Sequence, residues 1–214
     1  LEEGVLIITG GPGTGKTTTI RSIIQEFQDR NLSVALAAPT GRAAKRLSEA
    51  TGVEAKTIHR LLEFGFTPGT GLSYGRNEEK PLETEAVIID EASMIDLFLF
   101  HHLLKAISSG TKLILVGDQD QLPSVGPGSV LKDLISSGVA PVVILKTIFR
   151  QARESQIVTN AHRINAGLMP ILSQKKDFFF IEAKEPETVV DELLRLVMVR
   201  LPSYLKCDPM REIQ

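Results

Sequence analysis

A short glycine-rich segment near the start of the chain constrains its fold more than any other feature. Residues 10–17 read Gly-Gly-Pro-Gly-Thr-Gly-Lys-Thr, which matches the pattern G-x-x-x-x-G-K-[ST]. The apolar run Val5–Thr9 precedes this segment, and the helix-like stretch Gly15–Gln28 follows it. Glycines let backbone N–H groups converge on an anion, and a helix N-terminus adds partial positive charge. The pattern in this context predicts a phosphate-binding loop rather than an ordinary glycine-rich turn.

Two side chains of this loop have chemically distinct roles. We expect Lys16 to reach the β- and γ-phosphates of a nucleotide and the Thr17 hydroxyl to ligate Mg²⁺. Backbone N–H groups would supply most of the other contacts. The residues predicted to hold the nucleotide are Gly10, Gly11, Pro12, Gly13, Thr14, Gly15, Lys16, Thr17 and Thr18.

Short β-branched runs alternate with longer amphipathic stretches along most of the chain, which is typical of parallel strands joined by helices. The predicted strands are Val5–Thr9, Ser33–Ala37, Ala86–Asp90, Leu113–Val116 and Val142–Leu145. The predicted helices are Gly15–Gln28, Arg42–Ala50, Leu97–Ile107, Val130–Ile135 and Glu154–Asn165. The sequence therefore predicts an α/β fold of the RecA-like P-loop NTPase type, a parallel sheet flanked by helices.

The segment 64–84 interrupts this alternation. It begins with Gly65, Pro68 and Gly69 and continues into the charged stretch Arg76–Lys80. Closely spaced glycines and prolines favour turns. We therefore predict a small β-hairpin insertion here rather than an element of the core.

The character of the chain changes again near Met169. A strand-like segment, Asp177–Ile181, and a helix-like segment, Glu187–Arg200, follow. We predict a first domain over residues 1–168 and a linker with the beginning of a second α/β domain over residues 169–214.

Composition excludes several classes of protein. The longest apolar runs are far shorter than the roughly 20 residues of a membrane helix, so no membrane is expected as a partner. The single cysteine, Cys207, excludes an internal disulfide and fits a reducing cytoplasm. A net charge of −2 argues against a wholly basic nucleic-acid-binding protein, though not against a local basic patch. The chain has no initiator Met and no visible signal peptide, and we expect it to be part of a longer protein.

A second chemical signal lies at the end of the strand predicted over residues 86–90. There Asp90 and Glu91 follow a fully apolar run. In P-loop folds such a carboxylate can hold Mg²⁺, and the next one can polarise an attacking water. We predict these roles for Asp90 and Glu91; the alternative is that Asp90 merely caps the following helix. Because the guanine-recognising sequence Asn-Lys-x-Asp is absent, the nucleotide is predicted to be ATP.

Five further segments allow a more specific comparison. They are Ala38–Leu47, Thr57–Leu62, Asp90–Met94, Gly117–Pro123 and Ile148–Gln151. In order and spacing they resemble motifs Ia, II, III and IV of superfamily 1 helicases, with a short helical motif after Ia. The combination is similar to RecD-type 5′→3′ DNA helicases, a family that includes the α chain of exodeoxyribonuclease V, and it covers about residues 5–167.

This resemblance implies roles for two further catalytic residues. Gln119 would sense the γ-phosphate through its amide, which both donates and accepts hydrogen bonds. Arg150 would act as an arginine finger, a group worth about 10³–10⁵ in rate. The alternatives are a polar turn residue at Gln119 and a surface ion pair at Arg150.

The resemblance also implies a single-stranded DNA partner. Thr40 and nearby backbone N–H groups would contact DNA phosphates, with Arg42, Lys45 and Arg46 adding attraction. His59 would contact a phosphate, or else pack against its neighbours. Basic residues on a helix usually face solvent, so a purely solvated face is the alternative for each of them.

In RecD-like helicases a hairpin subdomain in the position of residues 64–84 acts as a strand-separating pin, with an inert hairpin as the alternative. The family needs two motor domains, and this chain holds only the opening of the second. We therefore expect the chain by itself to bind ATP–Mg²⁺ weakly, to hydrolyse it slowly at best, and not to unwind DNA. Other subunits of a nuclease–helicase complex are a candidate partner. Two other functions stay open: a different P-loop ATPase, such as a clamp loader, and a nucleotide-gated docking module.

Overall fold

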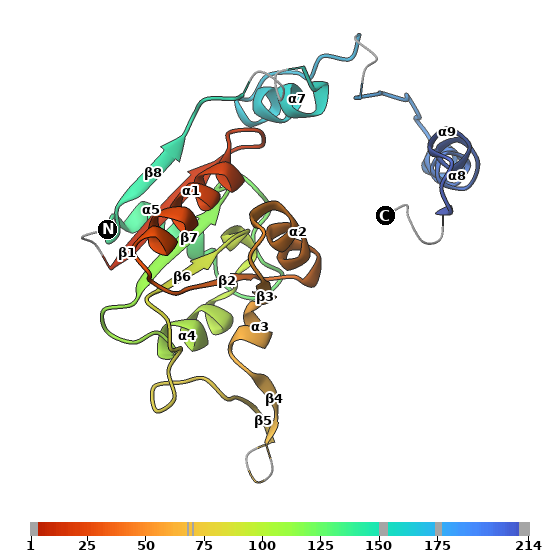
Figure 1. The fold of residues 1–214 in the computed structure, drawn as a ribbon. Coiled ribbons are helices and arrows are strands. Elements are labelled where there is room, and N and C mark those ends of the chain that lie inside the picture. Colours follow the sequence, from red (N-terminus) through yellow and green to blue (C-terminus); the bar gives the residue numbers. More distant parts are fainter. Residues whose placement is uncertain (1–3, 68, 70, 150–153, 174–176, 210–214) are drawn as a thin grey trace. The chain divides into compact units, whose positions relative to one another are not determined.

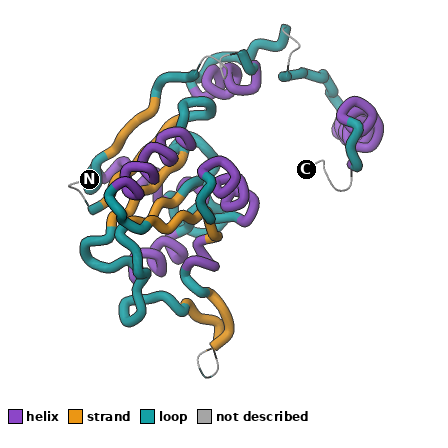
Figure 2. Tube along the Cα trace, viewed as in Figure 1, coloured by secondary structure: helices purple, strands orange, loops and turns teal. Residues whose placement is uncertain are grey.

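A computed structural model describes residues 4–67, 69, 71–149, 154–173 and 177–209. The chain separates into two compact units, Leu1–Ile171 and Leu172–Gln214. Unit 1 contains a parallel β-sheet covered by helices, and unit 2 contains helices and irregular chain among its described residues (Figures 1 and 2).

The sheet of unit 1 has six parallel strands in the order β3-β2-β6-β7-β1-β8. The strands are β1 (Val5–Gly10), β2 (Val34–Ala38), β3 (Ala55–Thr57), β6 (Ala86–Ile89), β7 (Lys112–Gly117) and β8 (Val142–Leu145). The four residues of β6 are all fully buried, as expected for a central strand that is covered on both faces. This topology confirms the α/β prediction, and β1 lies between β7 and β8.

Helices cover both faces of the sheet. Helices α1 (Lys16–Asp29) and α2 (Gly41–Thr51) pack on one face, where Ile20, Phe27 and Leu47 join one buried cluster (Figure 1). The opposite face carries the helices α3 (Ile58–Leu61), α4 (Leu97–Lys105) and α5 (Val130–Ser137). Alternate residues of each strand point to opposite faces, so Ile88 joins the first cluster and its neighbour Ile89 the second.

Side-chain caps fix the first turns of several helices. The Thr40 hydroxyl accepts a hydrogen bond from the Ala43 N–H at 3.2 Å and so begins α2. Asp96 Oδ1 accepts one from the Leu99 N–H at 2.7 Å at the start of α4. Such caps satisfy N–H groups that the helix itself leaves without a partner.

The predicted hairpin is present but shorter than the segment 64–84. Strands β4 (Phe64–Thr67) and β5 (Gly71–Tyr74) pair antiparallel, and Figure 2 shows them projecting beyond α3. The remainder is irregular chain, tied to the hairpin where Arg76 Nε donates to Glu63 Oε1 at 2.8 Å. Arg76 thereby ties the chain that follows β5 to Glu63, the residue just before β4.

One further helix of unit 1, α7 (Gln156–Asn165), follows β8, and the Ser155 hydroxyl caps it. In unit 2, α8 (Pro186–Arg195) continues through a π-helical turn (Leu196–Arg200) into α9 (Leu201–Leu205). The turn lies just before Pro202, whose ring cannot fit over an ordinary α-helical carbonyl four residues earlier. The helix predicted over Glu187–Arg200 is thus confirmed.

The strand predicted over Asp177–Ile181 is wrong, because these residues are irregular chain. A strand needs a neighbour for its backbone hydrogen bonds, and none of the described residues of unit 2 forms one. The sequence also missed β3, since three residues directly before a helix are too short to show an alternating pattern.

None of the described helices is both long enough and apolar enough to cross a membrane.

Candidate functional site

The glycine-rich loop follows the carboxyl end of β1, which is an inner strand of the sheet. Ligands of open parallel sheets bind at this edge. Gly13 and Gly15 have φ angles of 75° and 89°, which a side chain would strain. A Cβ atom at Gly15 would also overlap the ring of Phe149. The glycines therefore keep the loop narrow, as a cradle of backbone N–H groups requires.

Lys16 begins α1 with its ammonium group turned back onto the loop. Its Nζ donates to the Gly10 carbonyl at 2.6 Å and to the Gly11 carbonyl at 3.2 Å. The buried Thr14 hydroxyl donates to the same Gly11 carbonyl at 2.8 Å. The Lys16 ammonium group thus lies against the backbone carbonyls of its own loop. Thr17 and Thr18 follow in the first turn of α1 and are exposed.

Asp90 and Glu91 follow the end of β6 and lie beside Thr17. All three line one hollow of about 420 Å³. The Glu91 N–H donates to Asp90 Oδ1 at 2.9 Å, and Asp90 is not the N-cap of the turn that follows. Glu91 itself has left-handed backbone angles, φ 53° and ψ 39°, which cost a non-glycine residue free energy. Such strain occurs preferentially at functional sites, so the geometry supports a chemical role for this pair.

The electrostatics of the hollow fit a cation. Burial raises the pKa of the Asp90 carboxyl above its ordinary value. Its hydrogen bond from the Glu91 N–H opposes this rise, the Glu91 charge adds to it, and the Lys16 charge lowers the pKa again. The site combines a desolvated carboxylate, a second carboxylate and a hydroxyl. These are oxygen ligands for a hard cation such as Mg²⁺, whose charge would offset the cost of burying the Asp90 carboxylate. The side chains present therefore fit the predicted metal.

We expect Asp90→Asn to raise the free energy of unfolding in the absence of metal and nucleotide. The folded state disfavours the charged carboxylate, so its neutral replacement removes a cost that is present at neutral pH. The gain should shrink as the pH falls toward about 4, where the unfolded chain also takes up the proton. Urea unfolding of both proteins in EDTA, at about pH 7.5 and about pH 4.5, measures this. An equal or lower stability of the variant at the higher pH would contradict it.

The Gln119 loop, which we define as residues 118–121, lies beside the glycine-rich loop at the end of β7. The Gln119 N–H donates to the buried Thr9 hydroxyl of β1 at 3.2 Å. Asp118 is buried, and its Oδ1 accepts from the Asp120 N–H at 3.0 Å. Both loops line a common hollow of about 560 Å³. The structure thus brings Gln119 to the strand that carries the phosphate-binding loop.

The residues predicted to contact DNA lie on two elements, α2 with its N-cap Thr40 and α3 with His59. Thr40 and Arg42 line the hollow of Asp90, and so does Arg46. Lys45 is instead exposed, with its Nζ 3.9 Å from Glu49 Oε1. His59 lies at the base of the hairpin.

At that base His59 is one of five aromatic and imidazole rings linked by ring contacts. Its ring centroid lies 5.6 Å from that of Phe64 and 6.2 Å from that of Tyr74. Tyr74 also stacks on His102, with centroids 4.2 Å apart. The alternative of a packed histidine therefore describes the contacts of His59, although its side chain stays exposed.

Arg150 lies outside the described residues, so its predicted role stays a prediction. Its neighbour Phe149 is described, and its N–H donates to the Gly13 carbonyl at 3.1 Å. Sequence reasoning missed this contact and also His162 of α7, whose Nε2 lies 3.0 Å from the Pro12 carbonyl. No local pattern marks either residue, because both reach the loop only through the tertiary fold.

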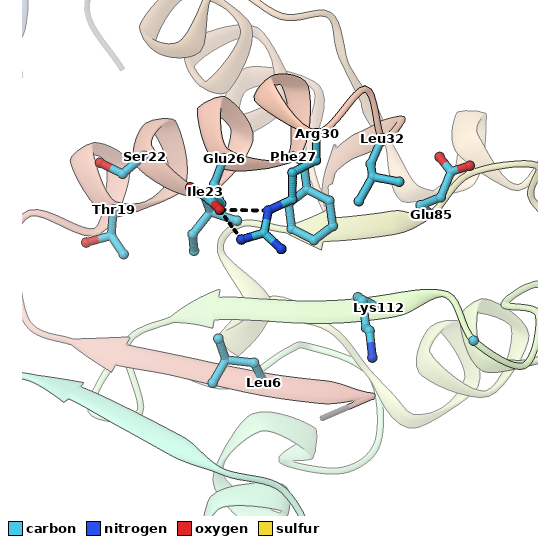
Figure 3. A pocket seen from close by; sticks show the side chains of 11 residues that line it. Leu6, Thr19, Ser22, Ile23, Glu26, Phe27, Arg30, Leu32, Glu85 and Lys112 are labelled. Atoms are coloured by element: carbon cyan, nitrogen blue, oxygen red, sulfur yellow. Dashed lines mark hydrogen bonds and ion pairs between the residues drawn. The ribbon is translucent and has the colours of Figure 1, made fainter. Parts of the chain in front are cut away.

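A more apolar hollow of about 540 Å³ lies elsewhere, between α1 and the sheet (Figure 3). Its lining includes Leu6 and Lys112, which stand at the amino ends of β1 and β7. Glu26 and Arg30, which form an ion pair at the end of α1, also line it (Figure 3). Parallel sheets bind ligands at the opposite edge. This hollow is therefore not the candidate site.

Among the described residues no three His, Cys, Asp or Glu side chains gather in a way that could hold a metal. A Mg²⁺ site of the predicted kind would take only one carboxylate and one hydroxyl from the protein, and phosphate oxygens and water would complete it.

Comparison with known proteins identifies related sequences and folds. A family model described as "AAA domain" matches residues 1–127. The ATP-dependent RecD2 DNA helicase of Deinococcus radiodurans is 39% identical over 172 residues, which are 80% of this chain and 23% of that protein. The RecBCD enzyme subunit RecD of Mycolicibacterium smegmatis is 39% identical over 174 residues, 70% of this chain and 31% of that protein. The chain thus spans about a quarter to a third of the length of these relatives.

Among solved structures, the Pif1 helicase from Candida albicans aligns with a TM-score of 0.58 and 25% identity. The alignment covers 93% of this chain and 51% of that protein.

Proposed function

The chain belongs to the AAA domain family, and we propose that it is a RecD-like member of superfamily 1. In this proposal it is the first motor domain of an ATP-dependent DNA helicase that acts in recombination and repair. One observation carries the proposal. Thr17, Asp90 and Glu91 line a single hollow next to the cradle of Lys16, at the edge of the sheet where ligands bind. A docking module that does not hydrolyse nucleotide would have no need to keep these three side chains together.

The chemistry follows from the positions of these side chains. Lys16 would exchange its two carbonyl partners for phosphate oxygens, which carry more negative charge. Asp90 and the Thr17 hydroxyl would hold Mg²⁺, which when bound neutralises charge on the phosphates. Glu91 would orient a water molecule and accept its proton. Gln119, tied by its backbone to Thr9, would report the state of the γ-phosphate to the rest of the domain.

The arginine finger belongs to this proposal as well. We carry Arg150 over from the resemblance. The N–H of its neighbour Phe149 donates to the Gly13 carbonyl, so Phe149 lies at the phosphate-binding loop.

Single-stranded DNA is the proposed polymer partner, and 5′→3′ movement is carried over from the resemblance. Arg42 and Arg46 lie one turn apart on α2, are exposed, and line the hollow of Asp90. DNA phosphates held there would lie near the hydrolytic carboxylates, which would couple the two ligands. We further propose the β4–β5 hairpin as the strand-separating pin, because Phe66 and Leu72 expose 76% and 70% of their surface along it.

The proposal leaves two arrangements for the whole protein, a separate helicase and a subunit of a complex. Relatives include a helicase named without a complex and a subunit named within one, so both arrangements are candidates, and a cytoplasmic location fits either. We propose unit 2 as the beginning of a second motor domain. None of the residues of α8 is buried, although Val190, Leu193 and Leu194 are apolar, and we propose that these side chains pack within that domain.

The test is steady-state ATP hydrolysis by the full-length protein that carries this segment, with and without single-stranded DNA. We expect strong stimulation by DNA, and Lys16→Ala supplies the background of contaminating ATPases. Hydrolysis indifferent to DNA would favour another P-loop ATPase, such as a clamp loader. Nucleotide binding without hydrolysis would favour a docking module.

A further inference from the structure

Helix α7 lies against the phosphate-binding loop (Figure 1). Its His162 Nε2 is 3.0 Å from the Pro12 carbonyl, and since a carbonyl only accepts, Nε2 must carry the proton. The same ring fills the space beside Gly11: a Cβ atom there would lie 2.6 Å from His162 Cε1. Gly11 does not have a positive φ angle, so its backbone would suit alanine. The imidazole is what excludes a side chain at this position.

One turn further along the same helix, Asn165 contacts the Gln119 loop. Its Nδ2 donates to Asp120 Oδ2 at 2.7 Å. The Asp120 N–H is in turn bonded to the buried Asp118. Gln119 lies between these two anchored residues. Asn165 is therefore linked through the Asp120 side chain to the segment that carries Gln119.

The helix is itself firmly held. Asn160 exposes only 1% of its surface, and its amide makes two hydrogen bonds to the backbone of Ile171, at 2.7 and 3.0 Å. Arg163 Nε donates to the Met169 carbonyl at 2.9 Å. These bonds close the chain after α7 back onto the helix. Ile171 is the last residue of unit 1, so the helix that contacts both loops also holds the point where the chain leaves the unit.

We propose that α7 is a strap that couples the phosphate-binding loop to the Gln119 loop, with His162 and Asn165 as its positioning residues. Both side chains line the hollow that the two loops share. When residues 10–15 become ordered, their contact with His162 restrains α7. The contact of Asn165 with Asp120 then restrains residues 118–121. Coupling of this kind is reciprocal, so loosening either contact loosens both loops. The proposal deepens the proposed nucleotide site and rests on it for its functional meaning.

The first test needs no nucleotide. Amide hydrogen exchange is measured on the 214-residue chain, for the wild type, His162→Ala and Asn165→Ala. Asn165 does not touch the phosphate-binding loop in any hydrogen bond of the described residues, yet its loss should speed exchange in residues 10–15. His162→Ala should likewise speed exchange in residues 118–121. Loss of one typical hydrogen bond corresponds to about a fivefold change in exchange rate.

A matched control separates coupling from general loosening. Ile157→Ala truncates an exposed residue of the same helix. It should leave exchange in both loops unchanged. If each variant changes only the loop that it contacts, or if Ile157→Ala has the same effect, the strap is refuted.

The second test is a rescue measured by the affinity for a fluorescent ADP analogue. Gly11→Ala should weaken binding, by roughly 5- to 150-fold if the misfit equals that of an overpacked core site. His162→Ala removes the ring that Gly11→Ala would meet, so the double variant should bind more tightly than Gly11→Ala alone. A double variant no better than Gly11→Ala would overturn the packing role of His162. If the wild type binds no nucleotide, the proposed function fails, and the exchange experiment still decides whether the strap exists.

Discussion

Glu91→Gln should lower the rate of ATP hydrolysis by the full-length protein about 10²–10⁴-fold, the usual contribution of a positioned general base. The amide keeps the size of the carboxylate but cannot accept a proton from water. Glu91 lies beside Asp90 and Thr17 in the hollow, whereas Lys16 lies on the glycine-rich loop, whose N–H groups would hold the phosphates. Nucleotide affinity should therefore change little. Single-turnover hydrolysis and equilibrium binding of a fluorescent nucleotide measure the two quantities separately.

The left-handed backbone at Glu91 provides the control for this prediction. Glutamine keeps the same backbone strain as glutamate and removes a negative charge beside Asp90, so the variant should unfold at the same or a slightly higher urea concentration. Glu49→Gln, on the exposed surface of α2, should leave the rate unchanged. Hydrolysis by Glu91→Gln within threefold of the wild-type rate, roughly the scatter between preparations, would assign the base to another group.

Leu103→Ala should lower the free energy of unfolding by about 2–5 kcal/mol, the range for large-to-small changes in packed cores. Leu103 of α4 is fully buried in the cluster that also holds Ile89, the residue before Asp90. The truncation removes apolar contacts and leaves a cavity that its neighbours cannot fill. For a domain of this size the melting temperature should fall by roughly 5–15 °C. Calorimetry or circular dichroism on the 214-residue chain measures the change.

The adjacent residue is a matched control. Leu104 is on the same helix and exposes 45% of its surface, so Leu104→Ala makes the same chemical change with less loss of burial. It should cost no more than about 1 kcal/mol. Similar losses for the two variants would mean that α4 does not pack on the sheet as described. Below the melting temperature of Leu103→Ala, nucleotide affinity should stay close to that of the wild type, because neither leucine lines the hollow of Asp90.

Much of the fold could be predicted from local patterns. The strand, loop and helix around residues 5–28 combine a buried apolar run, closely spaced glycines and an amphipathic helix, and each signal is contained in adjacent residues. The central strand β6 is equally plain, because its four residues are all apolar and buried. The segment Asp177–Ile181 shows the limit of such patterns. Its residues favour a strand, but a strand exists only where another strand accepts its hydrogen bonds.

The candidate site divides in the same way. Lys16, Thr17, Asp90 and Glu91 were predicted because each belongs to a short pattern at the end of an apolar strand. That the carboxylates and Thr17 line one hollow follows from the parallel sheet, which places the carboxyl ends of β1 and β6 at one edge. The sequence alone therefore determined the type of sheet and which side chains stand at its carboxyl edge.

Only the tertiary structure decided which other residues meet this chemistry. His162 lies about 150 positions after Pro12 in the chain and yet approaches its carbonyl. Asn165 reaches Asp120 across 45 positions, and Phe149 packs against Gly15. Contacts of this kind depend on how α7 and the chain after β8 return to the sheet. Their direction is set by the packing of many side chains together, and no short run of residues encodes it.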